Sequence, residues 1–282
     1  MEERNIPPTR HRIPIITMAK RPRLNVGSTI NGHDCIGVEG HTSPFTSKPT
    51  RIIAIEGNIA AGKSTLINNI EEWSEKTNLP CRVVVIPECL DRFTTFNEYN
   101  PLALAYSNPK ENVTVTQLHI IRSINKMMEE VVGAEVDHHQ YEEENVKKQT
   151  IIVTDRSLFS PIVFTHQHHI GGNINQFVRD YLIEETINNA ESTLRGLGLE
   201  YVGLFFLQVQ SDECHNRLMK RGRVYECMKN INLYLSELES QYADHVDWWK
   251  TYCGEDNIFV HKSEGEQSAL QNFISFFERF SR

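Results

Sequence analysis

The sequence predicts an α/β fold with a five-stranded parallel sheet and helices on both faces. Three observations support this prediction. Five short, nearly continuous apolar runs recur along the chain, segments with helical spacing separate them, and a glycine-rich loop joins the first run to the first helical segment. Strands that lack polar alternation are covered on both faces, which is typical of parallel sheets.

The five apolar runs are the expected strands, and the segments between them are the expected crossovers. The runs are RIIAIE (51–56), RVVVIPE (82–88), TIIVTD (150–155), YVGLFFLQV (201–209) and NIFVH (257–261). Helices that connect parallel strands form right-handed crossovers. The polar segment 134–149 interrupts this pattern, and we expect it to be a surface excursion.

Residues 1–50 differ in composition from the rest of the chain. They contain six prolines, few apolar residues and no clear period, which predicts a flexible N-terminal tail before one domain over residues 51–282. The tail has seven Lys/Arg against four Asp/Glu, while the whole chain has a formal net charge of −8. The domain is therefore acidic, which disfavours a nucleic-acid polymer as its partner.

Composition also indicates where the protein functions. No apolar run approaches the length that a membrane span needs, so we expect no transmembrane helix. Six cysteines without a C-x-x-C pair indicate a reducing compartment, and we expect a cytoplasmic protein. The basic cluster MAKRPR (18–23) leaves a nuclear address open, whereas Glu2 and Glu3 disfavour a mitochondrial transit peptide.

The stretch EGNIAAGKST (56–65) contains the G-x-x-x-x-G-K-S pattern of a phosphate-binding loop. Glycines at positions 57 and 62 allow the backbone to approach a phosphate closely, and the following helix N-terminus favours anions. Lys63 suits the β and γ phosphates, and the Ser64 hydroxyl suits Mg²⁺. The expected contacts are Gly57, Asn58, Ile59, Ala60, Ala61, Gly62, Lys63, Ser64 and Thr65. The loop predicts a site for ATP or GTP, and the chain has no N-K-x-D run that would support a GTPase.

Charged side chains follow the second and third expected strands. Glu88 closes the second strand, where a carboxylate can take a proton from an attacking hydroxyl. Asp155 closes the third strand in a position to help hold Mg²⁺, and Arg156 can neutralise charge during transfer. From the residues alone, a solvated acid and an ordinary surface ion pair remain open alternatives. Phe93 is either a substrate-pocket wall or part of the core.

An amide and a basic cluster complete the candidate residues. Gln117 lies on the apolar face of the helical segment 111–128, where it either pairs with a planar base or is satisfied within the core. The segment RLMKRGR (217–223) fits a mobile lid over phosphates or a solvated helix end; its candidate ligands are Arg217, Arg221 and Arg223. The cluster HQHH (166–169) has no acid or cysteine at a matching spacing, so we expect surface histidines and no metal site.

Taken in order, these motifs resemble the deoxyribonucleoside kinase family over about residues 51–250. That family includes mitochondrial-type and herpesvirus thymidine kinases and the deoxycytidine and deoxyguanosine kinases. IEGNIAAGKST is similar to its I-E-G-N-I-G-x-G-K-T/S-T, IPECLDRF to its P-E-P-V-x-x-W, and TDRSLFS to its E/D-R-S motif. RLMKRGRVYE resembles its lid, and NPLALAYSNPKENVTVTQ resembles the segment with a sugar-contacting Tyr and a base-reading Gln. The tail and the divergent motifs would suit a viral member.

The resemblance implies a P-loop kinase fold with an arginine-rich lid. It implies transfer of the γ-phosphate of ATP, with Mg²⁺, to the 5′-hydroxyl of a deoxynucleoside in nucleotide salvage. In that family pattern Glu88 is the catalytic base, Gln117 pairs with the base, and Tyr106 and Glu226 hold the sugar. Arg156 and the lid arginines stabilise the transferring phosphoryl group. Family members are commonly dimers, so the resemblance also implies a homodimer.

Several positions depart from the family pattern. Ile124 and Pro161 stand where deoxycytidine kinases have the Arg and Asp that read cytosine or adenine. An apolar pair cannot make those hydrogen bonds, which favours thymidine or a broad pyrimidine preference. The family's stacking aromatic is expected at Thr165, but Phe164 lies one residue earlier, so either the register shifts or the stacking weakens.

Two alternatives remain open. A nucleoside monophosphate kinase of the thymidylate type shares the loop and the lid but needs an extra cationic contact, whereas Tyr106 with Glu226 suits a sugar hydroxyl. A non-catalytic scaffold subunit that resembles the family is the second alternative. Such a protein should lose Lys63, Glu88 or Arg156, and all three residue types are present here.

Overall fold

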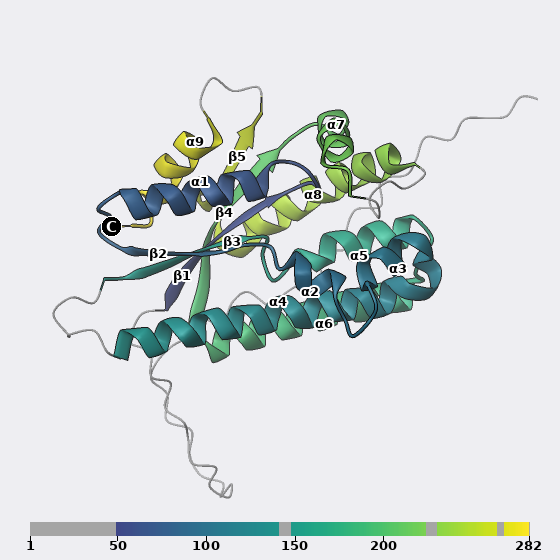
Figure 1. The fold of residues 1–282 in the computed structure, drawn as a ribbon, viewed down its shortest axis with the longest axis horizontal. Helices are drawn as coiled ribbons and strands as arrows, with labels where there is room; N and C mark the ends of the chain where they lie inside the picture. Colours follow the sequence, from purple (N-terminus) through teal and green to yellow (C-terminus); the bar gives the residue numbers. More distant parts are fainter. Residues whose placement is uncertain (1–48, 141–147, 224–229, 264–267, 282) are drawn as a thin grey trace, which may run out of the picture. The chain divides into compact units, whose positions relative to one another are not determined.

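The computed structural model describes residues 49–140, 148–223, 230–263 and 268–281. Over these residues five strands form one parallel sheet in the order β2-β3-β1-β4-β5, which confirms the predicted fold class (Figure 1). The strands are β1 (Thr50–Gly57), β2 (Arg82–Ile86), β3 (Thr150–Asp155), β4 (Leu199–Gln208) and β5 (Ile258–Lys262). The predicted N-terminal tail lies almost wholly outside the described residues and stays a prediction.

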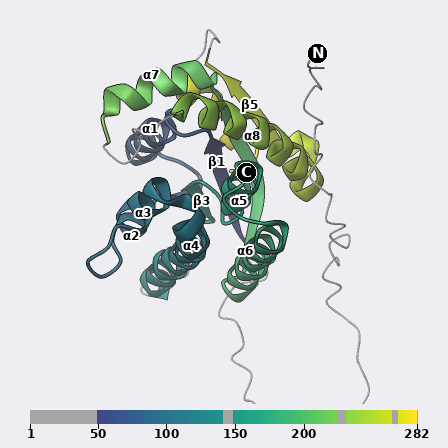
Figure 2. The ribbon, with the colours of Figure 1, turned by 90° about the vertical axis from the view of Figure 1, so that its right-hand side faces the viewer.

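Helices cover both faces of the sheet because the strands are apolar on both sides. The helices are α1 (Lys63–Lys76), α2 (Leu90–Thr94), α3 (Pro101–Ser107), α4 (Pro109–Gln140), α5 (Pro161–Ile170), α6 (Gln176–Gly196), α7 (Ser211–Arg221), α8 (Ile231–Cys253) and α9 (Ala269–Phe277), with a 3₁₀ turn at Glu255–Asn257. Helices α1 and α9 pack on one face, whereas α4 and α6 lie together on the other (Figures 1 and 2). No helix in the described part of the chain is long and apolar enough to cross a membrane.

Adjacent aromatic residues on β4 show how the two faces are filled. The Phe205 ring lies 5.5 Å from that of Phe273 on α9, measured between ring centroids. The next side chain points the other way, and the Phe206 ring lies 5.8 Å from that of Tyr242 on α8. Alternate side chains of a strand point to opposite faces, so the run of apolar residues from Leu204 to Leu207 in β4 is explained by a helix layer on each side.

Helix α4 differs from the prediction at its C-terminal end. It continues to Gln140, so the polar segment that begins at residue 134 is helical at first and is not an irregular excursion from its start. The helix extends past the buried Val132 and exposes Gly133 and Ala134. Polar composition alone cannot separate an exposed helical turn from a loop. The remainder of the predicted excursion, 141–147, lies outside the described residues.

The order of the strands brings three chain segments to one edge of the sheet. Strands β1 and β3 are neighbours, and the connections that follow them run in opposite directions along the sheet, to β2 and to β4. In open α/β sheets, ligands bind at the carboxyl ends of strands where this happens. Here that edge carries Gly57 at the end of β1, Glu88 after β2 and Arg156 after β3.

Candidate active site

The loop between β1 and α1 has the backbone geometry of a phosphate cradle. Gly62 has φ 100° and Ala60 has φ 61°, which turn successive main-chain amides inward. The Lys63 ammonium donates to the carbonyl oxygens of Gly57 at 3.2 Å and Asn58 at 3.0 Å. Burial lowers the pKa of Lys63, and the nearby Arg156 lowers it further. An anion bound at the loop would therefore stabilise the charged form of this buried side chain.

Asn58 has a different role from the phosphate contact that its place in the loop predicts. Its side-chain nitrogen donates to the carbonyl oxygen of Leu235 on α8 at 2.9 Å. Its side-chain oxygen accepts from the main-chain N–H of Ile59 at 2.8 Å. The side chain is buried and holds the loop against α8, so only its main chain is available to a phosphate.

Gly57 is required by close packing. A Cβ at this position would lie 2.8 Å from the carbonyl oxygen of Leu207, and φ is +153°. Because the backbone oxygen has little room to move, we expect Gly57→Ala to destabilise the fold by about 1–3 kcal/mol. Urea unfolding measures this change. Gly133→Ala is the matched control, since nothing lies within 4 Å of its Cβ, and alanine should stabilise an exposed helix by about 0.5–1 kcal/mol. Equal midpoints for the two variants would contradict the packing argument.

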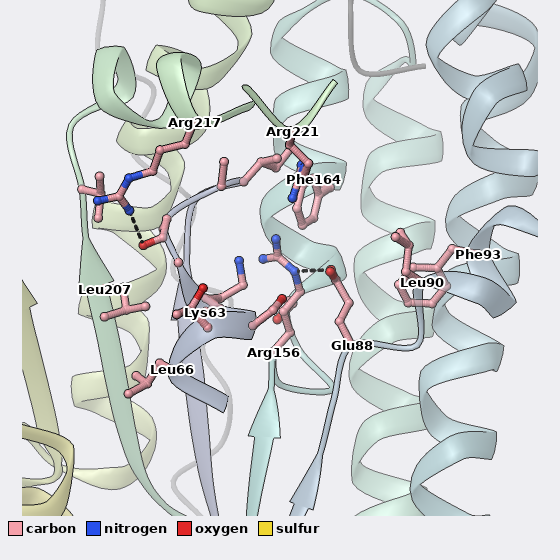
Figure 3. A pocket seen from close by; sticks show the side chains of 18 of the residues that line it. Lys63, Leu66, Glu88, Leu90, Phe93, Arg156, Phe164, Leu207, Arg217 and Arg221 are labelled. Carbon is pink, nitrogen blue, oxygen red and sulfur yellow. Dashed lines mark hydrogen bonds and ion pairs between the residues drawn. The ribbon is translucent and has the colours of Figure 1, made fainter. Parts of the chain in front are cut away.

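Glu88 and Arg156 form an ion pair at the centre of the site (Figure 3). Arg156 Nε donates to Glu88 Oε1 at 2.9 Å, and its Nη1 donates to the carbonyl oxygen of Gly57 at 3.3 Å. The same Nη1 also donates to the Tyr242 hydroxyl. Burial acts to raise the pKa of Glu88, but Arg156 and then Lys63 outweigh it, so the pKa is lowered. Glu88 is therefore ionised at neutral pH.

The side chains of Ser64 and Asp155 meet beside this ion pair. The Ser64 hydroxyl donates to Asp155 Oδ2 at 3.2 Å. The other carboxylate oxygen, Oδ1, is buried, and no residue in the described ranges hydrogen-bonds to it. Burial raises the pKa of Asp155, an effect that Lys63 opposes. A hard cation would satisfy the vacant oxygen and the charge together.

Glu56 is a buried acid whose role the sequence does not reveal. Its Oε1 accepts from the main-chain N–H of Ser157 at 3.0 Å and from the Ser157 hydroxyl at 2.8 Å. The Ser160 hydroxyl also donates to this oxygen, and Arg156 Nη1 lies 3.8 Å from Oε2. Arg156 has φ 73°, which L-residues seldom adopt. The Glu56 hydrogen bonds hold the turn that imposes this conformation.

One cavity of about 770 Å³ joins the phosphate loop to the residues expected to bind the acceptor. The predicted residues that line it are Ile59, Ala60, Ala61, Gly62, Lys63, Ser64, Thr65, Glu88, Phe93, Tyr106, Gln117, Ile124, Arg156, Pro161, Phe164, Arg217, Arg221 and Arg223. Asp155 lies beneath it, bonded to Ser64. Glu226 lies outside the described residues. Tyr234, Leu90 and His168 also line the cavity and were not predicted as site residues. Leu90 and His168 lie in segments that the sequence singles out, IPECLDRF and HQHH, but nothing in those segments shows that these two side chains face the cavity.

Phe164 takes the aromatic position in the cavity. Its ring lies 5.1 Å from the Arg156 guanidinium carbon, measured to the ring centroid. Thr165 is fully buried and does not line the cavity. Of the two alternatives for the stacking residue, the structure therefore favours the shift by one residue, with Phe164 in place of Thr165. Figure 3 shows Phe164 above Arg156, with Phe93 on the far side of Glu88.

The basic cluster begins at the end of α7, above the phosphate loop. Arg217 Nη1 donates to the carbonyl oxygen of Ala61 at 3.0 Å and also pairs with Glu213. Arg221 ends α7, and Gly222 follows with φ 69°. Arg221 points toward the cavity in Figure 3. These arginines thus lie beside the phosphate loop and line the same cavity.

The histidines of α5 do not lie on the surface as expected. His166 and His168 are 7% and 8% exposed. Helix α5 packs between α6 and α8, which buries residues on several of its faces. The prediction of surface histidines was therefore wrong for His166 and His168, because their burial depends on helices that are distant in sequence.

The fold, the phosphate loop and the carboxylate–arginine pair define a P-loop kinase architecture. The family model for deoxynucleoside kinase matches residues 53–279. This chain belongs to the deoxynucleoside kinase family.

The chain is also similar to individual deoxynucleoside kinases. The chain is 26% identical to deoxycytidine kinase of Mus musculus over 220 residues, which cover 73% of this chain and 79% of the relative. It is 26% identical over 239 residues to a probable deoxycytidine kinase of fowlpox virus, covering 79% and 87% of the two chains. The structure of deoxyadenosine kinase from M. mycoides with bound dCTP shares the fold, with a TM-score of 0.59, 19% identity, and coverage of 81% of this chain and 99% of that one.

Proposed function

We propose that this protein transfers the γ-phosphoryl group of ATP to the 5′-hydroxyl of a deoxynucleoside with a pyrimidine base, thymidine included. The observation that supports this most directly is the shared cavity. A phosphate loop lies at one end, and Gln117 and Phe164 lie at the other, with Glu88 and Arg156 also on its wall. This arrangement suits a donor and a small acceptor that meet inside one enclosed site.

The proposed chemistry uses groups already described. Glu88 accepts the hydroxyl proton: Oε1 is held by Arg156, and no donor in the described residues occupies Oε2. Its side chain is 25% exposed, which gives a hydroxyl access. Arg156 and the α7 arginines neutralise the charge on the transferring group, and Lys63 binds the phosphates of the donor.

The donor set at Ser64 and Asp155 fits Mg²⁺, because it consists of a hydroxyl and a carboxylate with one vacant buried oxygen. Ser64 and Asp155 would hold the ion, which would supply positive charge against the phosphates of the donor. Asp155 would supply the carboxylate ligand; burial raises its pKa, and the nearby Lys63 acts against that rise. Tyr106 lines the cavity and is proposed, with Glu226, to hold the sugar.

The base preference rests on the acceptor end of the cavity. Gln117 is buried, and its Oε1 has no hydrogen-bond partner among the described residues. Such an oxygen is costly unless a ligand satisfies it, so the amide suits the paired donor and acceptor edge of a base. Ile124 and Pro161 present apolar surface beside it. The matched relatives are named for deoxycytidine, deoxyguanosine or deoxyadenosine. Ile124 and Pro161 are the residues that extend the proposal to thymidine.

The test is phosphate transfer from Mg·ATP to each of the four deoxynucleosides and to thymidylate, with wild type and Gln117→Leu. We expect pyrimidine deoxynucleosides to react, and Gln117→Leu to lower their kcat/KM by about 10- to 100-fold through two lost hydrogen bonds. The KM for ATP should not change. Without nucleoside, the variant should unfold at an equal or higher urea concentration, because it removes an unsatisfied buried oxygen. Reaction with thymidylate alone would replace this proposal with a monophosphate kinase.

A homodimer is also proposed. Apolar side chains are exposed near the N-terminal ends of α4 and α6, which pack together: Val115 on α4, and Phe177 and Tyr181 on α6. Phe177 is 79% exposed. Large exposed apolar side chains on neighbouring helices are typical of protein interfaces. The cytoplasmic location remains a prediction from composition.

A further inference from the structure

His168 is a buried side chain that reaches the acceptor end of the cavity. It lies on α5, one helical turn after Phe164, and both residues line the cavity. Its ring centroid is 6.3 Å from that of Tyr234 on α8, and the Tyr234 ring is 6.5 Å from that of Tyr106. His168 therefore shares a wall with residues proposed to hold the nucleoside.

The hydrogen bonding of the ring indicates where its proton lies. The side-chain nitrogen of Asn173 lies 3.4 Å from His168 Nδ1. An amide NH₂ group only donates, so Nδ1 accepts and the ring proton is on Nε2. Burial lowers the pKa of His168 to about 4, so the ring is neutral at physiological pH. No acceptor in the described residues is bonded to Nε2, which leaves one N–H donor available at the cavity.

The pyrimidine that Gln117 pairs with has an acceptor left over. An amide offers one donor and one acceptor. Paired with cytosine, it uses N3 and the 4-amino group, so O2 remains. Paired with thymine, it uses N3–H and one carbonyl oxygen, so the other carbonyl oxygen remains. Either base needs one further N–H donor, and an unpaired carbonyl in an enclosed site is costly.

We propose that His168 is a specificity-determining residue, whose Nε2–H donates a hydrogen bond to the pyrimidine carbonyl oxygen that Gln117 leaves unpaired. This inference rests on the proposed function. It adds a hydrogen-bond donor from α5, whereas the vacant Oε1 of Gln117 on α4 is an acceptor.

A structural role within the core is the competing explanation, and His166 provides the comparison. It is two residues away on the same helix and equally buried, but it does not line the cavity. Burial also lowers its pKa to about 4. A histidine that only fills space in α5 should therefore respond to substitution as His166 does.

The first experiment measures deoxynucleoside binding to the full chain by isothermal titration calorimetry. His168→Leu should weaken thymidine and deoxycytidine binding about three- to tenfold, as expected for one lost hydrogen bond. His168→Gln should restore most of this affinity, because its amide nitrogen reaches the place of Nε2. His166→Leu should leave nucleoside affinity within about twofold. Equal losses in His168→Leu and His166→Leu would overturn the proposal.

The second experiment removes the acceptor from the ligand. 2-Thiothymidine and 4-thiothymidine each replace one carbonyl oxygen with a weakly accepting sulfur. In wild type, both should bind more weakly than thymidine, because Gln117 and His168 each donate to one carbonyl oxygen. For one of the two analogues this difference should disappear in His168→Leu, since the contact is then already lost. The same difference in both proteins, for both analogues, would overturn the proposal. A wild-type protein that binds no deoxynucleoside would instead contradict the proposed function.

Discussion

Replacing Glu88 with glutamine is expected to lower kcat by about 10²- to 10⁴-fold, the usual contribution of a positioned general base. Glutamine keeps the size of the side chain and an oxygen to accept from Arg156 Nε, which donates at 2.9 Å in the native structure. It cannot accept a proton from the attacking hydroxyl. The measurement is single-turnover phosphate transfer to the best deoxynucleoside, with circular dichroism to confirm folding.

Glu98→Gln is the matched control, because Glu98 is exposed on the connection between α2 and α3. Its kcat should match wild type. The wild-type rate should also show no decline on the acid side until the pH is below 4.5, since the pKa of Glu88 is lowered from that value. A folded Glu88→Gln protein with the wild-type kcat would remove Glu88 as the base.

Replacing Arg156 with leucine is expected to affect both catalysis and stability. The guanidinium is 12% exposed and balances two carboxylates, those of Glu88 and Glu56. Leaving a buried charge without its partner costs about 3–5 kcal/mol. Transfer should fall by at least about 10³-fold, the scale of a transition-state arginine. Urea unfolding and single-turnover transfer measure the two effects.

Arg156→Lys separates charge from geometry. Lysine keeps a cation near the carboxylates but cannot donate simultaneously to Glu88, Gly57 and Tyr242 as the planar guanidinium does. Stability should recover in part while catalysis stays low. Full recovery of the rate would mean that charge alone is sufficient.

The stability difference between wild type and Arg156→Leu should depend on pH. The folded pKa of Glu88 is lowered, so its pairing with Arg156 stabilises the fold above the ordinary value of 4.5. That contribution is lost as the pH falls through the folded pKa. The difference in unfolding free energy should therefore narrow in acid. A difference that is constant down to pH 4 would contradict the assigned ion pair.

The sheet could be predicted because its strands are apolar on both faces. Such runs are short, continuous and separated by helical spacing, and each expected strand lies within two residues of the observed one. The charged residues Glu88 and Asp155 could also be placed at the ends of β2 and β3 from the sequence alone, because each directly follows an apolar run. The C-terminal part of α4 was not predicted as helix because the segment from residue 134 is mostly polar and shows no apolar period.

The other site residues depend on contacts between distant parts of the chain. Glu56 reads as one more residue of an apolar strand, and its partner Ser157 lies 101 residues later. His168 belongs to a cluster whose burial is set by α6 and α8 rather than by its own segment. The role of Asn58 could not be seen either, since it bonds to Leu235, 177 residues away. Glu226 and the N-terminal tail remain predictions.

Glu56 connects the phosphate loop to the turn that carries Arg156. It directly precedes Gly57, the first residue of the phosphate loop, and its Oε1 holds the main-chain N–H of Ser157, the residue after Arg156. The loop and the arginine are thus each one peptide unit from the same carboxylate. Phosphoryl transfer requires reacting atoms to be held within a fraction of an ångström. The single Glu56 carboxylate therefore fixes the phosphate loop and Arg156 relative to each other.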